Sequence, residues 1–102
     1  MQPFIIQQQS RQIYSPQLPL AVYREVAAHL RQVEGVSAEL ILRPIEHQPN
    51  AKFDYYESQV AALKISYLKE ITTKDKQRVA EILDYYGVRY RPWENGSAID
   101  NN

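Results

Sequence analysis

The stretch that decides the fold is VAAHLRQVEGV at residues 26–36, because it nearly recurs as RVAEILDYYGV at residues 78–88. Aligned on Gly35 and Gly87, the two copies share apolar positions: Ala27 with Val79, Ala28 with Ala80, Leu30 with Ile82 and Val36 with Val88. In each copy, apolar residues at helical spacing lead to a glycine and then to a β-favouring residue. This pattern predicts a helix, a glycine that ends it, and a strand, twice in one chain.

The first copy extends into a longer helix and a full strand. Pro19 suits the first turn of a helix, where its missing N–H costs nothing. From there to Gly35, apolar residues recur at spacings of three and four, which predicts one buried helix face. Residues 36–43 then alternate between two sides, as a strand does, and Pro44 ends them.

The second copy is preceded by an ambiguous segment at residues 58–68. Its apolar positions fit a helix in part, but a two-residue alternation covers more of them, so we predict a strand that pairs antiparallel with residues 36–43. Thr72 and Asp75 then have the spacing of a helix cap. The helix is predicted to end at Gly87, and residues 88–91 to form the last strand.

The remaining segments complete one α+β domain over residues 1–102. Residues 4–6 are predicted as a short strand, residues 7–17 as a connection and residues 46–54 as a loop. Residues 1–3 and 95–102 are expected to be flexible. The resulting order, β-α-β-β-α-β, predicts a ferredoxin-like fold, in which an antiparallel sheet carries both helices on one face. That fold hosts too many activities to indicate one of them.

Composition excludes several classes of function. The 102 residues contain 12 basic and 12 acidic side chains, so the chain lacks the net positive charge typical of a dedicated nucleic-acid binder. There is no cysteine, which excludes disulfides and thiolate chemistry. With glycine only at positions 35, 87 and 96, no glycine-rich phosphate loop is possible. No apolar run is long enough to span a membrane. We expect a soluble cytoplasmic protein without a cofactor.

Residues that could carry catalysis are few. His29 lies on the first helix and His47 follows Glu46 in a loop, but neither has other metal ligands at suitable spacing. Asp54 and Glu57 form a carboxylate pair of the kind that surface loops commonly carry. No metal site is predicted, and an enzyme that uses a histidine is the third interpretation.

The alternation of the predicted strands points to a candidate binding face. On the side of the sheet away from the helices it places four cationic residues and a tryptophan, as a contact surface for a partner or an anion: Arg43, Lys64, Arg89, Arg91 and Trp93. Three apolar residues on the same side are the predicted interface: Ile41, Val60 and Ala62. Arginine and tryptophan are frequent at binding hot spots. A solvated face with ion pairs, such as Glu39 with Lys64, is the plain alternative.

We therefore expect a small non-catalytic interaction or regulatory protein that forms a homodimer or binds a protein partner through this open face. The alternative is a binder of an anionic ligand or of single-stranded nucleic acid on the same face. Nucleic acid is the weaker of these ligands, because the central strands lack the aromatic residues of RNA-recognition modules.

Overall fold

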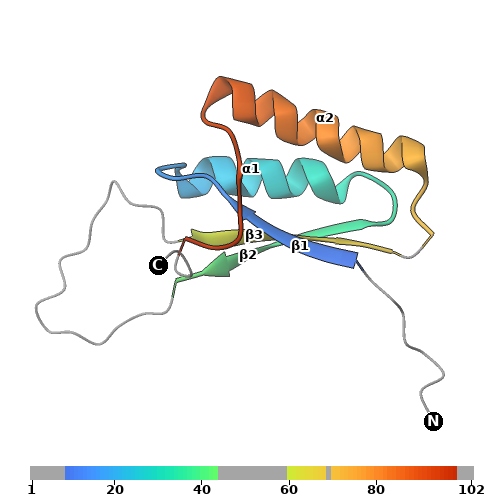
Figure 1. Ribbon diagram of the computed structural model, residues 1–102, viewed down its shortest axis with the longest axis horizontal. Helices are drawn as coiled ribbons and strands as arrows, with labels where there is room; N and C mark the ends of the chain where they lie inside the picture. Colours follow the sequence, from blue (N-terminus) through green and yellow to red (C-terminus); the bar gives the residue numbers. More distant parts are fainter. Residues whose placement is uncertain (1–8, 44–59, 69, 99–102) are drawn as a thin grey trace, which may run out of the picture.

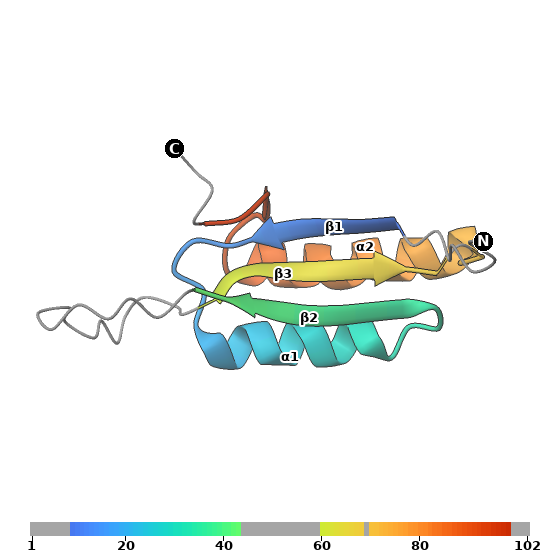
Figure 2. The ribbon, with the colours of Figure 1, turned by 90° about the horizontal axis from the view of Figure 1, so that it is seen from below.

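The computed structural model describes residues 9–43, 60–68 and 70–98, which form one sheet covered by two helices. In chain order the elements are β1 (Gln9–Tyr14), α1 (Leu20–Arg31), β2 (Val36–Leu42), β3 (Val60–Tyr67), α2 (Thr73–Arg89) and β4 (Glu94–Asn95). The four strands pair antiparallel in the order β2-β3-β1-β4. Both helices lie on the same side of the sheet (Figures 1 and 2). The predicted α+β class is confirmed.

The starts of both helices and the pairing of β2 with β3 agree with the sequence patterns. α1 begins one residue after Pro19, whose carbonyl accepts a hydrogen bond from the amide of Tyr23 (3.1 Å). α2 is capped by Thr72, whose hydroxyl oxygen accepts from the amide of Asp75 (3.1 Å). The ambiguous segment is a strand over Val60–Tyr67 and pairs antiparallel with β2, as predicted.

The first strand is an element that the sequence pattern misses. The predicted strand at residues 4–6 lies outside the described residues, whereas part of the predicted connection, Gln9–Tyr14, is a strand between β3 and β4. Its first four side chains are polar and exposed, so no apolar alternation marks it. Its strand conformation depends on backbone pairing with β3, for example between Ile13 and Leu63.

The second helix does not end at Gly87. α2 continues through this residue to Arg89, and the amide of Tyr90 still donates to the carbonyl of Tyr86 (2.9 Å). The predicted strand over residues 88–91 is therefore wrong, and β4 contains only Glu94–Asn95. A glycine inside a helix costs about 1 kcal/mol relative to alanine. The backbone hydrogen bonds of this last turn offset that cost.

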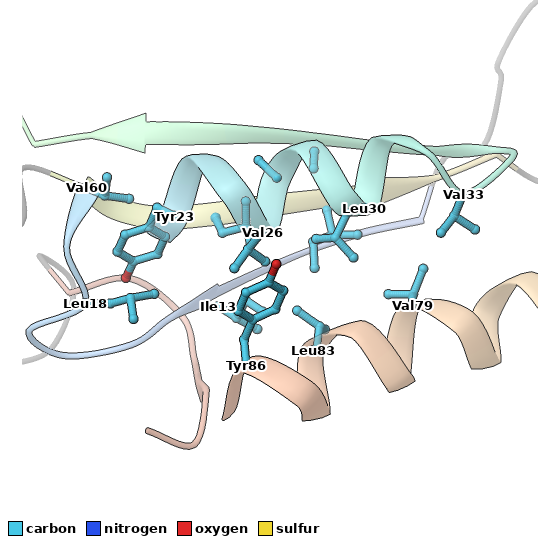
Figure 3. Packing of buried hydrophobic residues seen from close by; sticks show 14 residues of the cluster. Ile13, Leu18, Tyr23, Val26, Leu30, Val33, Val60, Val79, Leu83 and Tyr86 are labelled. Atoms are coloured by element: carbon cyan, nitrogen blue, oxygen red, sulfur yellow. The ribbon is translucent and has the colours of Figure 1, made fainter. Parts of the chain in front are cut away.

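The core fills the layer between the helices and the sheet (Figure 3). Leu30 of α1 and Leu63 of β3 are fully buried, and Tyr86 of α2 is nearly so. The residues labelled in Figure 3 include side chains from β1, α1, β3 and α2, and β2 adds Ala38 to the core. The two helices therefore pack on the sheet and on each other through one continuous cluster.

Val60 belongs to this core and not to the opposite face, where the two-residue alternation predicts it. Ile41 pairs with Ala62, but the next residue, Leu42, pairs with Val60, so Ala61 has no partner on β2. An extra residue of this kind reverses the side to which the following residue points. The predicted placement of Val60 is therefore wrong, and Figure 3 shows its side chain among the core residues.

Candidate functional site

The uncovered face of the sheet carries an ion pair at its centre. Lys64 lies between the buried residues Leu63 and Ile65, so its side chain points away from the helices. Its Nζ lies 4.0 Å from Oε1 of Glu39 on β2. The Glu39 side chain is largely exposed, the Lys64 side chain is partly exposed and the two atoms are at the limit of an ion-pair distance, so this pair contributes little to stability.

The three predicted interface residues do not form an exposed apolar patch. Val60 is in the core, Ala62 is fully buried and Ile41 is half-buried. Four residues farther along the same two strands, Ser37 of β2 pairs with Ser66 of β3. The uncovered face is therefore mostly polar in the part of the sheet that the structure describes.

The five residues of the predicted contact surface lie in separate places. Lys64 is on the uncovered face, and Arg43 is an exposed residue that follows β2. Arg89 is the last residue of α2, and its guanidinium carbon lies 5.3 Å from the centre of the Tyr85 ring. Arg91 is exposed beyond the helix. Arg89 and Arg91 are two positions apart in the sequence, and the uncovered face of the sheet carries Lys64 without them.

Trp93 points into the molecule. Its indole Nε1 donates a hydrogen bond to the carbonyl of Leu83 on α2 (2.9 Å), and its ring meets the ring of Tyr23 edge-on, with centroids 6.0 Å apart. The Trp93 ring lies against Gly87 of α2, where a Cβ would be 3.5 Å from Cδ1 of Trp93, an ordinary contact. Trp93 therefore holds the chain after α2 against the helix and lies away from the uncovered face of the sheet.

Tyr23 in turn holds the loop between β1 and α1. Its hydroxyl oxygen accepts from the amide of Ser15 (2.8 Å), and its proton is donated to the carbonyl of the same residue (3.1 Å). Burial raises the pKa of the Tyr23 hydroxyl, against the opposing effects of the Ser15 backbone and the charge of Arg43. This hydroxyl is thus neutral and occupied by structural hydrogen bonds.

A hollow of about 590 Å³ lies beside α2 and β1, and we call it the α2–β1 hollow. β1 contributes Arg11 to its lining, and α2 contributes one acidic residue, Asp84. The other lining residues are mostly apolar: Ala80, Leu83, Gly87, Val88, Tyr90, Pro92 and Trp93. Val88 is 79% exposed and Tyr90 is 48% exposed, so the rim of the hollow presents large apolar side chains to solvent. Its volume is in the range of ligand-binding clefts.

A second polar cluster joins the two helices. The Tyr86 hydroxyl donates to Oε2 of Glu25 (2.9 Å) and lies 2.7 Å from Nδ1 of His29. Because the hydroxyl has only one proton and donates it to Glu25, the contact with His29 is a hydrogen bond when Nδ1 of His29 is the donor. Burial, followed by the hydrogen bond to Glu25, raises the pKa of Tyr86 to about 12. Figure 3 shows Tyr86 reaching from α2 toward α1.

A smaller hollow of about 300 Å³ lies next to this cluster, and Arg78 and Glu81 of α2 line it together with His29, Tyr85 and Tyr86. His29 itself is exposed, so water has free access to it. The arrangement satisfies the buried hydroxyl of Tyr86 and ties α1 to α2. Such a network serves packing, and general-base chemistry would additionally need a substrate held against Nε2.

Some predicted candidates lie outside the described residues, among them His47, Asp54 and Glu57. Within residues 9–43, 60–68 and 70–98, no three His, Asp or Glu side chains converge as metal ligands would. No helix in that part of the chain combines the length and the apolar character needed to cross a membrane.

Sequence reasoning missed Arg11 because it placed this residue in a connection, and it missed Asp84 because nothing in the sequence shows that this face of the helix lies beside β1. The helix cluster had a signal, since Glu25 and His29 are four residues apart and so share one face of α1. Compared with known protein families, with curated proteins and with solved structures, the chain gives no match.

Proposed function

We propose that this protein is a non-catalytic binding protein that recognises a protein partner through the C-terminal end of α2. The observation that supports this best is the exposure of three large side chains there, Tyr85, Val88 and Tyr90, on the rim of the α2–β1 hollow or next to it. Arg89 and Arg91 flank them in the chain. Aromatic residues and arginine are enriched in protein–protein interfaces and dominate their hot spots.

This surface replaces the uncovered sheet face as the place where we expect the contact. The sheet face carries a solvated ion pair and serine side chains, whereas the end of α2 offers apolar area beside a concave surface. Arg89 and Arg91 give the surface positive charge, so the expected partner is acidic near its contact. Binding is then expected to weaken as the salt concentration rises.

The test is affinity capture of partners from the source cells with the tagged chain. Val88→Asp combined with Tyr90→Ala should abolish the capture, and Arg89→Ala combined with Arg91→Ala should weaken it. Lys64→Ala is the matched control, because it removes a positive charge from the opposite side of the sheet and should leave the capture unchanged. Equal capture by the wild type and the α2 variants would refute the proposal.

Self-association remains part of the proposal, since a second copy could cover the same apolar rim. Light scattering at high micromolar concentration tests it, and Val88→Asp should then give monomers. Val60→Glu is not a suitable variant, because Val60 lies in the core and a charge there would unfold the protein.

Binding of an anionic ligand or of single-stranded nucleic acid is a second candidate that the exposed Arg89 and Arg91 favour. Trp93 is half-buried and its indole is hydrogen-bonded to Leu83, so it does not present a free stacking face of the kind that such binders use. A labelled oligonucleotide that binds tightly at low salt, and that loses affinity in the double arginine variant, would favour this candidate over a protein partner.

Catalysis by a histidine is the third candidate, and the chain of contacts from Glu25 through Tyr86 to His29 is the observation that favours it. Hydrolysis of an activated ester by wild type and His29→Gln protein would test it. A rate that falls to the background level in His29→Gln would support a general base at this position.

The finer description of the fold is also a proposal. We infer a ferredoxin-like arrangement, supported by the β-α-β-β-α-β order and by β3 and β1 as the two central strands. The short β4 is a departure from two equivalent halves.

A further inference from the structure

One edge of the sheet is only partly covered. β1 is paired along its length with β3, but on its other side β4 reaches only Ile13 and Tyr14. Among the described residues, none pairs with that side of β1 at Gln9–Arg11. The open part of the edge lies on the side of the molecule that α2 borders (Figure 2).

Gly96 explains why β4 is short. Its amide donates to the carbonyl of Gln12 (2.9 Å), which is the last contact between this part of the chain and the β1 edge. Gly96 then adopts a positive φ of 98°, and the amide of Ala98 donates instead to the carbonyl of Ala61 on β3 (2.9 Å). The chain thus turns away from the edge, and none of the residues that the structure describes occupies the position next to Gln9–Arg11.

The backbone of this open edge presents hydrogen-bonding groups. In a strand, the N–H and C=O of one residue point to the same side, and the side alternates with each residue. Because the Gln12 carbonyl faces β4, the groups of Ser10 and the amide of Gln12 face the same way. An added antiparallel strand could therefore bond to Ser10 and Gln12 while the pairing of Arg11 with β3 stays intact.

The α2–β1 hollow lies next to this edge and supplies a place for side chains. Arg11 shares the helix side of the sheet with Ile65, its partner on β3, and Arg11 lines the hollow. Every second residue of an added strand would point the same way, toward Ala80 and Val88 of α2. Among the described residues, the charges of the lining are Arg11 and Asp84, which have opposite signs, so the hollow favours neutral, apolar side chains over charged ones.

We infer that the α2–β1 hollow binds an extended segment of a partner protein, which adds a strand to the open edge of β1. The segment carries apolar residues at alternate positions facing α2 and polar residues between them, which continue the polar face of the sheet. This mode of recognition takes affinity from backbone hydrogen bonds and specificity from alternate side chains. The inference rests on the proposed function, because it names the occupant of the same surface.

The probe is the tightest binder selected from a displayed library of random heptapeptides against the full chain. Ser10→Pro removes the outward amide but none of the bonds to β3, and proline is tolerated on edge strands. It should weaken peptide binding about tenfold, as expected for the loss of one backbone hydrogen bond. Ser37→Pro is not a suitable control, because β2 has its own role in the core. The control is Ser66→Ala, which alters the uncovered face of the sheet and should leave peptide binding unchanged.

The peptide itself provides a second test that does not depend on the folding of a variant. Methylation of alternate backbone nitrogens should abolish binding in one register and leave it intact in the other, because only every second amide faces β1. In the bound state, the amides of Ser10 and Gln12 should become protected from hydrogen exchange. The inference would be overturned if neither Ser10→Pro nor the position of the methyl groups changed the affinity for the peptide.

The outcomes separate this inference from the proposed function. If Val88→Asp with Tyr90→Ala abolishes capture of the cellular partner but Ser10→Pro does not, the surface binds a partner in another way and strand addition is refuted. If none of these variants alters capture, both proposals fail. A dimer of the wild type that Ser10→Pro converts to monomers would assign the edge to a second copy of this chain and would also overturn the inference.

Discussion

The two glycines that align in the repeated sequence perform different tasks. Gly35 follows α1 with a positive φ of 80° and leads directly into the seven residues of β2. Gly87 lies inside α2, two residues before its end, and β4 has only two residues. The two halves of the chain therefore share a sequence pattern but differ in where the helix ends and in the length of the following strand.

The difference teaches that a glycine permits a helix to end without requiring it. At Gly35 the preceding turn has already left the helix, and the carbonyl of Gly35 accepts from the amide of Leu68 after β3 (2.9 Å). At Gly87 the backbone hydrogen bonds of the helix continue, and the Trp93 ring packs against the backbone of Gly87. Contacts with distant residues thus decide between the two outcomes.

The largest expected effect concerns the aligned residues Leu30 and Ile82. Leu30 is fully buried, whereas Ile82 is half-buried at the side of the core. Leu30→Ala should lower the free energy of unfolding by about 2–5 kcal/mol, as buried large-to-small changes do. Ile82→Ala should cost clearly less. Urea denaturation measures both, and equal losses would show that the two halves pack alike.

The next effect concerns the backbone of Gly35. Alanine at a left-handed position costs roughly 1–2 kcal/mol, and a Cβ there meets only ordinary contacts with Ile71 and Leu68, at 3.8–3.9 Å. Gly35→Ala should therefore destabilise the protein by that amount through strain alone. A thermal melt gives the result, and an unchanged melting temperature would mean that this turn is not held in the left-handed form.

A loss of about 1 kcal/mol is expected for Tyr86→Phe, which removes the hydrogen-bonded link between α1 and α2. The raised pKa of Tyr86, about 12, adds a dependence on pH. The folded state holds the phenol proton more tightly than the unfolded state, so this stabilisation is present below pH 10 and is lost as the pH rises toward 12. Denaturation of wild type and Tyr86→Phe across that range should show converging stabilities. Parallel curves would refute the link.

The smallest effect has the opposite sign. Gly87→Ala should stabilise the protein by about 0.5–1 kcal/mol, because alanine is the better helix former and its Cβ would lie 3.5 Å from Trp93, an ordinary contact. Together with Gly35→Ala, this variant tests the comparison directly: the same substitution at aligned positions should shift the melting temperature in opposite directions. Destabilisation at both would mean that Gly87 needs more freedom than a helix demands.

The sequence predicted those elements in which the spacing of apolar side chains matches the buried face. α1 and β3 have apolar residues at the period of their structure, so Leu30 and Leu63 could be assigned to the core from spacing alone. β1 could not be found, since Gln9–Gln12 are polar and owe their conformation to a partner strand from the other half of the chain. The bulge at Ala61 similarly depends on how β2 and β3 meet.

The candidate site was harder to predict for the same reason. Arg89, Arg91 and Trp93 were grouped by assuming a strand, and the continuation of α2 rotates them to different sides. Arg11 and Asp84 line the same hollow because the fold places β1 beside α2. No local pattern in the sequence shows that β1 and α2 are neighbours.

The position of β1 between β3 and β4 also bears on how the molecule forms. Both of its partners lie farther along the chain, so β1 emerges from the ribosome well before β3 and β4, the strands that it pairs with. Contacts between distant segments slow folding, because a long loop must close before they form. The sheet can be completed only after β3 has been synthesised, and a nascent chain that stops after β2 would hold two strands that are not neighbours in the sheet. Folding of this domain is therefore expected to begin late in synthesis, with β3 as the strand that joins the others.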